Sequence, residues 1–128
     1  MKVLADTVTF LWMVSEPQHL SQAARAALVS HSNSVYLSAA SVIEICVKHS
    51  LGRLALPESP ETWIPKVRSQ HRIDPFPLDE AASLRMASLP MLHRDPFDRM
   101  LVCQALVHGL VLVTPDALIH QYNIQTLW

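Results

Sequence analysis

Short apolar segments that alternate with helix-like segments constrain the fold of this chain more than any other feature. The strand-like segments are Val3–Ala5, Val35–Leu37, Leu110–Val113 and Ile124–Trp128. Between them, apolar residues recur at the spacing of amphipathic helices. Strands that alternate with helices form a mostly parallel sheet that is covered on both faces. We therefore predict a three-layer α/β fold with a mostly parallel central sheet flanked by helices.

Capping and helix-breaking residues set the expected helix boundaries. The predicted helical segments are Val8–Val14, Gln22–His31, Ser38 or Ser41 to Ser50, a helix that begins near Pro60, Asp79–Ser88 and Pro96–His108. Ile73–Pro77 contains proline and is predicted to be a short or edge strand.

The third of these helices carries an apolar stripe at the spacing of a buried helix face. Its members are Ala39, Val42, Ile43, Cys46 and Val47. Cys46 belongs to this stripe and Cys103 lies in another apolar helical segment, so we expect both to be buried, reduced thiols.

The composition fits one domain over residues 1–128. Half of the 128 residues are apolar and only two are glycine, which argues against linkers and disorder. The sequence begins directly with a strand-like segment, and no apolar run approaches the ~20 residues that span a bilayer. We therefore expect a cytoplasmic protein that does not bind membranes. The seven histidines form no HxH or HExxH pattern, and none is placed in the sequence as a general base.

Four acidic residues lie where strand-like segments give way to helices. They are Asp6, Glu44, Asp98 and Asp116. In an open α/β sheet these positions converge on one crevice. Carboxylates ~4–6 Å apart repel each other by roughly 3–4 kcal/mol per pair at an effective dielectric constant near 20. The cluster therefore requires protonation or a hard divalent cation, and oxygen-only ligands favour Mg²⁺ or Mn²⁺.

Three of these acids also have ordinary structural explanations. Asp6 and Asp116 each precede a helical segment, where an acid caps the helix or interacts favourably with its dipole. Glu44 can complete a capping box with Ser41, and it precedes Lys48 by four residues, which suits a helical ion pair. Local sequence alone leaves both alternatives open.

Asp98 is the most informative of the four acids. Leu101, Val102 and Ala105 follow it at the spacing of one helix face, so Asp98 lies in line with the buried stripe of its helix. The alternative is an acid in the first turn of a helix whose N-cap is Asp95. We assign Asp95 mainly to that capping role.

Several other side chains are candidates for contacts with substrate or partner. Lys48, Arg53, Arg94 and Arg99 flank the acids in the sequence and are predicted to contact phosphate groups. The apolar run Phe10–Val14 exceeds what one helix face needs. It is predicted either to pack in the core or to dock a partner helix or a second subunit.

The order and spacing of four motifs resemble the PIN-domain ribonucleases of VapC-type toxin–antitoxin systems. The motifs are Leu4–Thr7 with Phe10–Trp12, Ser38–Ser41 with Glu44, Ile45 and Lys48, His93–Arg99, and Leu112–Thr114 with Asp116. This resemblance covers the whole chain, and the sequence HRDPFDR is its most specific element. It implies a PIN fold, an acidic Mg²⁺ or Mn²⁺ site, endoribonuclease activity, homodimer formation and inhibition by a small antitoxin protein.

By position, the resemblance assigns Asp6, Glu44, Asp98 and Asp116 to the acidic quartet of the family. It assigns Thr114 to a hydroxyl residue beside the last acid, which we predict to contact substrate. We expect one or two Mg²⁺ ions, held chiefly by Asp6 and Asp98, to activate water against an RNA phosphodiester. The products would then carry 5′-phosphate and 3′-hydroxyl ends.

Two other classes of protein share part of this pattern. A phosphatase of the haloacid-dehalogenase type also places Asp after its first strand, but it needs a second acid two residues later, where this chain has Val8. A receiver-like binding module needs Asp at the end of a middle strand, where Leu37 is followed by Ser38. A PIN domain without catalytic activity is a third alternative.

Overall fold

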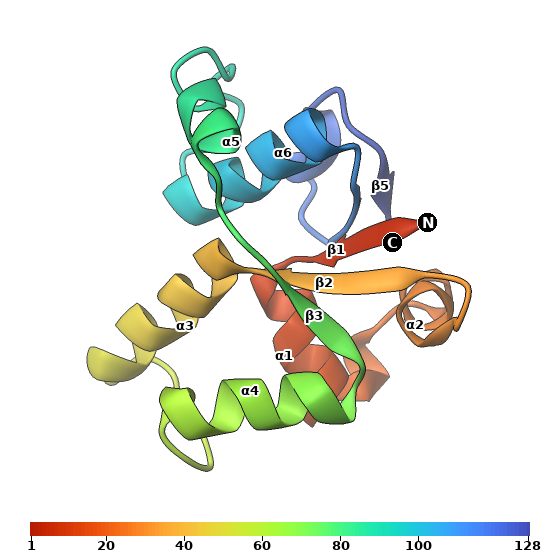
Figure 1. The fold of residues 1–128 in the computed structure, drawn as a ribbon, viewed down its shortest axis with the longest axis vertical. Coiled ribbons are helices and arrows are strands. Elements are labelled where there is room, and N and C mark those ends of the chain that lie inside the picture. The colour runs from red at the N-terminus through yellow and green to blue at the C-terminus, as the bar shows by residue number, and fades with distance from the viewer.

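A five-stranded parallel sheet forms the middle layer of the structure, a computed structural model that describes residues 1–128 (Figure 1). The strands are β1 (Lys2–Ala5), β2 (Ser34–Ser38), β3 (Ile73–Phe76), β4 (Val111–Val113) and β5 (Thr126–Leu127). Their spatial order is β3-β2-β1-β4-β5, and every neighbouring pair is parallel. The predicted α/β architecture is therefore confirmed.

Helices cover both faces of the sheet (Figure 1). One face carries α1 (Thr7–Ser15), α2 (Gln22–Val29), α3 (Ala39–Ser50) and α4 (Pro60–Gln70), and the other carries α5 (Glu80–Arg85) and α6 (Pro96–His108). Two short 3₁₀ turns, η1 (Pro17–His19) and η2 (Ile119–Gln121), complete the chain. None of the helices combines the length and the apolar character that spanning a bilayer requires.

The alternation of side chains along β1 divides the interior into two cores. Val3 and Ala5 face the core beneath α1 to α4, which also contains Phe10. Leu4 faces the opposite core, where it packs with residues of α6 such as Leu101. Successive residues of a strand point to opposite faces of a sheet, so a short, fully apolar strand is buried on both sides.

The chain reverses its direction of travel across the sheet at β1. It builds outward from β1 to β2 and β3, and then crosses to the other side of β1 to form β4 and β5. Such a switch point leaves a crevice at the carboxyl ends of the two strands that flank it. The backbone N–H of Asp6 donates to the Val113 carbonyl at 3.1 Å, which joins the two strands at that edge.

Most helices begin at a capped residue. Ser38 Oγ accepts the Ala40 N–H at 3.0 Å, so α3 begins one turn earlier than a Ser41 cap would allow. Asp95 Oδ1 accepts the Phe97 and Asp98 N–H groups at 2.8 and 3.3 Å, which confirms its predicted capping role. The capping box of Ser41 with Glu44 is therefore not formed.

The predicted buried stripe of α3 is wrong. Ile43 and Val47 are 49% and 42% exposed, and Cys46 is exposed as well, whereas Cys103 is buried as predicted. The buried residues of α3 are Ala40, Ser41, Glu44 and Ile45. The helix presents to the interior the face that carries its hydroxyl and carboxyl groups, because that face lies beside the end of β1.

The apolar run of α1 is divided between core and surface. Phe10 and Met13 are buried, while Leu11 and Trp12 are partly buried and line a groove of about 260 Å³. The ring of Trp12 lies 6.0 Å from that of Trp128 at the end of the chain. The core interpretation is confirmed for Phe10 and Met13, and docking of a partner stays a prediction.

The two isoleucines of α3 provide a test of this orientation. Ile45→Ala should lower the free energy of unfolding by about 2–5 kcal/mol, because Ile45 is fully buried and its loss leaves a cavity. Ile43→Ala, the same substitution on the outer face, should change it by no more than about 0.5 kcal/mol. Urea unfolding of both variants measures the difference. Equal destabilisation would show that the helix is rotated from the position described.

Candidate active site

Asp6 is fixed at the carboxyl end of β1 by one donor to each carboxylate oxygen. Its Oδ1 accepts the Thr9 N–H at 2.8 Å, and its Oδ2 accepts the Thr114 hydroxyl at 2.5 Å. Thr114 follows β4, so this second hydrogen bond links the two strands at the switch point. Asp6 is 3% exposed and Thr114 is fully buried. Asp6 therefore both caps α1 and forms part of a polar cluster.

Glu44 reaches the same edge of the sheet from α3. Its Oε1 accepts the Thr7 hydroxyl at 2.6 Å, and its Oε2 accepts a hydrogen bond from Lys48 Nζ at 2.5 Å. The Thr7 hydroxyl has one proton, so the Ser41 Oγ at 2.9 Å donates to Thr7. With 5% of its surface exposed, Glu44 is not a solvated surface acid.

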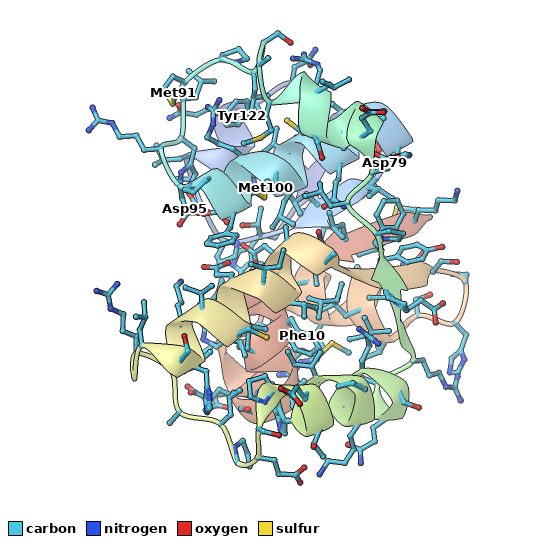
Figure 2. All side chains as sticks on the ribbon, turned by 60° about the vertical axis from the view of Figure 1, so that its left-hand side comes forward. Phe10, Asp79, Met91, Asp95, Met100 and Tyr122 are labelled. Atoms are coloured by element: carbon cyan, nitrogen blue, oxygen red, sulfur yellow. The ribbon has the colours of Figure 1, made fainter.

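A third group of side chains lies where the loop before α6 meets the loop after β4. His93 Nε2 lies 2.8 Å from Asp116 Oδ2 and 3.2 Å from Asp98 Oδ2. One ligand atom from each of these three residues lies within 4.8 Å of the others, a group that does not include Asp6 or Glu44. Figure 2 shows Asp95 at the start of α6, on the same side of the molecule as α3.

Sequence reasoning missed His93. The residue lies in a loop, where apolar periodicity carries no information, and it belongs to no metal-binding histidine pattern. Its position inside HRDPFDR, two residues before the helix cap Asp95, was the one available signal. His93 had no predicted role at the site, and the prediction that no histidine acts as a general base stays a prediction.

Two of the predicted substrate contacts do not fit the structure. Arg99 is 7% exposed, and its guanidinium donates to the backbone carbonyls of Leu89, Pro90 and His93. Thr114 is fully buried, so its hydroxyl positions neighbouring groups and does not meet substrate. Both side chains hold the site together from within.

Arg94 and Lys48 remain available at the surface. Arg94 is exposed beside His93, and the Lys48 side chain is 48% exposed while it pairs with Glu44. The hydrogen bond with Glu44 raises the pKa of Lys48, so this amine keeps its positive charge beside the acids. Both residues stay predicted contacts for phosphate groups.

Similarity to known proteins agrees with this arrangement. The PIN-domain family matches residues 3–124 of the chain. Ribonuclease VapC22 of Mycobacterium tuberculosis is 32% identical over 117 residues, which cover 89% of this chain and 86% of that protein. The chain belongs to the PIN-domain family, among the VapC-type ribonucleases. The predicted family is therefore confirmed.

Solved structures share the fold at low identity. VapBC2 from Rickettsia felis, bound to a promoter DNA fragment, superposes with a TM-score of 0.74 at 12% identity, over 98% of this chain and 97% of that one. DNA-bound VapBC from Salmonella typhimurium gives a TM-score of 0.67 at 20% identity, over 98% and 96%. These two similarities support the PIN fold.

PIN nucleases depend on metal ions, and the donor set of this PIN domain fits a hard cation. Burial raises the pKa of Asp98 to about 7, and the neighbouring charge of Asp95 adds to the effect. Burial also raises the pKa of Asp6. The partly buried Asp98 carboxylate accepts no hydrogen bond from any protein group. A cation would supply the charge and the contacts that Asp98 lacks.

Asp116 has the opposite balance. Burial acts to raise its pKa, but hydrogen bonds from His93 and from the Leu118 N–H outweigh burial and lower the pKa below its ordinary value. Its Oδ1 accepts the Leu118 N–H at 2.8 Å. Hydrogen bonds therefore favour the charged form of Asp116, whereas burial and then the charge of Asp95 disfavour the charged form of Asp98.

Replacing Asp98 tests the electrostatic description of the metal-free site. The pKa of Asp98 is higher in the folded protein than in the unfolded chain, so wild type should lose stability as pH rises from about 4 to about 7. Asp98→Asn removes this loss and should be more stable than wild type at pH 8 by about 1–2 kcal/mol, after allowance for solvent screening. Urea unfolding in excess chelator at pH 5 and pH 8 provides the measurement.

Asp74→Asn is the control for this prediction, because Asp74 is exposed on the edge strand β3. It should show no gain that grows with pH. If Asp98→Asn is instead less stable than wild type at pH 8, the charge of Asp98 does not destabilise the folded protein and this description of the site is wrong.

Proposed function

We propose that this chain is a Mg²⁺-dependent endoribonuclease and the toxin of a toxin–antitoxin pair. The observation that carries the proposal is the surroundings of Asp98, which accepts no hydrogen bond from the protein and shares the His93 ring with Asp116. Burial raises the pKa of Asp98, and the charges of Asp6 and Glu44 act on it in the same direction. Mn²⁺ is a substitute with the same preference for oxygen ligands. The similarity of the chain to a VapC-type ribonuclease supports RNA as the substrate.

The ion would be held chiefly by Asp98 and Asp6, with Glu44 and Asp116 completing the acidic pocket. When bound, it supplies the positive charge that makes a water molecule a strong nucleophile at neutral pH and neutralises charge on the phosphate. The chain's own contribution is orientation. Thr114 fixes Asp6 and Thr7 fixes Glu44, so these carboxylates reorganise little when substrate binds.

The contacts of His93 argue against a metal-free route through a histidine base. One ring nitrogen accepts a hydrogen bond from the Asp95 N–H, and the other lies 2.8 Å from Asp116. Neither nitrogen has a lone pair directed at open space. We therefore expect water to be the group that attacks the phosphate. The expected products carry 5′-phosphate and 3′-hydroxyl ends.

Lys48 and Arg94 are the proposed contacts for the RNA backbone. Both are accessible, and Lys48 lies directly beside the acidic pocket through its pairing with Glu44. A positive charge at the rim of an acidic pocket attracts phosphate without entering the pocket. We also propose that a small antitoxin protein binds and inhibits the chain, since the structural neighbours include VapBC complexes, and that the chain forms a homodimer.

RNA cleavage by protein freed of antitoxin tests this proposal. Cleavage should require Mg²⁺ or Mn²⁺ and stop in excess chelator, and a small phosphomonoester should not be hydrolysed. Glu44→Gln should reduce cleavage at least about 10–100-fold, because glutamine still pairs with Thr7 but lacks the charge. Its melting temperature should stay close to that of wild type.

Glu61→Gln is the control, because Glu61 is exposed in the first turn of α4; it should cleave RNA like wild type. Full activity in chelator, products that end in 2′,3′-cyclic phosphate, or an active Glu44→Gln variant would refute the mechanism. Hydrolysis of the phosphomonoester would favour the phosphatase alternative.

A further inference from the structure

His93 is held in place from both sides of its backbone. Its N–H donates to the Tyr122 hydroxyl at 2.9 Å, and its carbonyl accepts a hydrogen bond from Arg99 at 3.3 Å. The residue is 8% exposed. Its ring is thereby directed between Asp98 and Asp116, which come from two different segments of the chain. These contacts fix the position of the His93 ring relative to both acids.

The contacts of the ring determine which nitrogen carries the proton. The backbone N–H of Asp95 lies 3.1 Å from Nδ1. A backbone N–H can only donate, so Nδ1 accepts and carries no proton. The proton of the neutral ring is therefore on Nε2, which donates to Asp116 Oδ2 at 2.8 Å.

We propose that His93 is a positioning residue that holds Asp116 beside Asp98 through its Nε2–H group, and that it is not a metal ligand. The inference rests on the proposed metal-dependent nuclease function and adds the role of one residue to it. Asp116 lies on a loop, and its carboxylate is oriented by two donors, the Leu118 N–H and His93. Loss of His93 removes one of these two donors.

A histidine with two carboxylates is also a familiar ligand set for transition metals, but the hydrogen bond from Asp95 to Nδ1 disfavours that role here. A metal bound at Nε2 requires a lone pair on that atom, which moves the ring proton to Nδ1. The Nδ1–H group would then face the Asp95 N–H, donor against donor. That N–H belongs to the cap residue of α6, whose backbone is fixed by the start of the helix.

The state of the His93 ring can be read directly in the wild-type protein. Nitrogen-15 NMR of the histidine side chains, in chelator and in saturating Mg²⁺, reports which ring nitrogen carries the proton. We expect the Nε2–H form of His93 under both conditions. A change to the Nδ1–H form when Mg²⁺ is added would overturn the proposal, because it would free Nε2 to act as a ligand.

Two substitutions separate a donor from a ligand. Glutamine places an N–H donor near the position of Nε2, whereas asparagine reaches only to that of Nδ1. Calorimetry should show that His93→Asn weakens Mg²⁺ and Mn²⁺ binding by the same factor, about 10–100-fold, as loss of a supporting hydrogen bond does. His93→Gln should stay much closer to wild type for both ions.

His120→Gln is the matched control, because the His120 ring lies 2.7 Å from the Thr114 carbonyl and makes no contact with the acids. It should bind both ions like wild type. A loss of Mn²⁺ affinity far larger than that of Mg²⁺ would identify His93 as a ligand. Equal effects of Asn and Gln, or no effect of either, would also refute the proposal.

The two proposals fail in different ways. A wild-type protein that binds no Mg²⁺ and cuts no RNA would refute the proposed function, while NMR of the ring would still test the position of the proton on His93. If His93→Asn does not fold, the ratio of Mg²⁺ to Mn²⁺ affinity in His93→Gln decides, and it must equal that of wild type.

Discussion

Repulsion between carboxylates at one edge of the sheet is the constraint on which the rest of this structure depends. Two carboxylates ~5 Å apart repel each other by roughly 3 kcal/mol at an effective dielectric constant near 20. The protein offsets this repulsion by giving three of its four acids separate donors. Asp6 receives Thr114, Glu44 receives Thr7, and Asp116 receives His93. Asp98 alone accepts no hydrogen bond from the protein, which is why we propose that a cation binds there.

The hydrogen bonds of Glu44 at this edge fit the orientation of α3. A helix of this composition could bury either of two faces, and the structure buries the one that carries Ser41 and Glu44 together with Ile45. The outer face therefore keeps Ile43 and Val47 exposed. The helix leaves these apolar side chains exposed while it buries the Glu44 carboxylate. Such a conflict between the local sequence pattern and the fold is common at functional sites.

The switch point between β1 and β4 brings together groups that are far apart in the sequence. Asp6 and Thr114 are 108 residues apart, yet their side chains share a hydrogen bond. The loop before α6 contributes His93, and the loop after β4 contributes Asp116. A parallel sheet suits this purpose because all its strands end at the same edge, where short loops can present side chains over a rigid support.

The sequence by itself determined the order of strands and helices, the cap at Asp95 and the positions of the four acids at segment boundaries. These features are local, because strand and helix periodicity and capping depend on residues a few positions apart. The inward direction of Asp98 was also predictable, since Asp98 stands at the head of the buried stripe of its own helix. The family motifs added the expectation of a nuclease.

Only the tertiary structure decided which face of α3 is buried, that Arg99 supports a loop from inside and that His93 lies among the acids. Spacing defines the faces of a helix but not which of them meets the sheet. The destination of a long side chain such as Arg99 depends on carbonyl groups of residues up to ten positions away. Loop residues such as His93 have no periodicity at all, so their contacts are fixed by packing between segments that are distant in the chain.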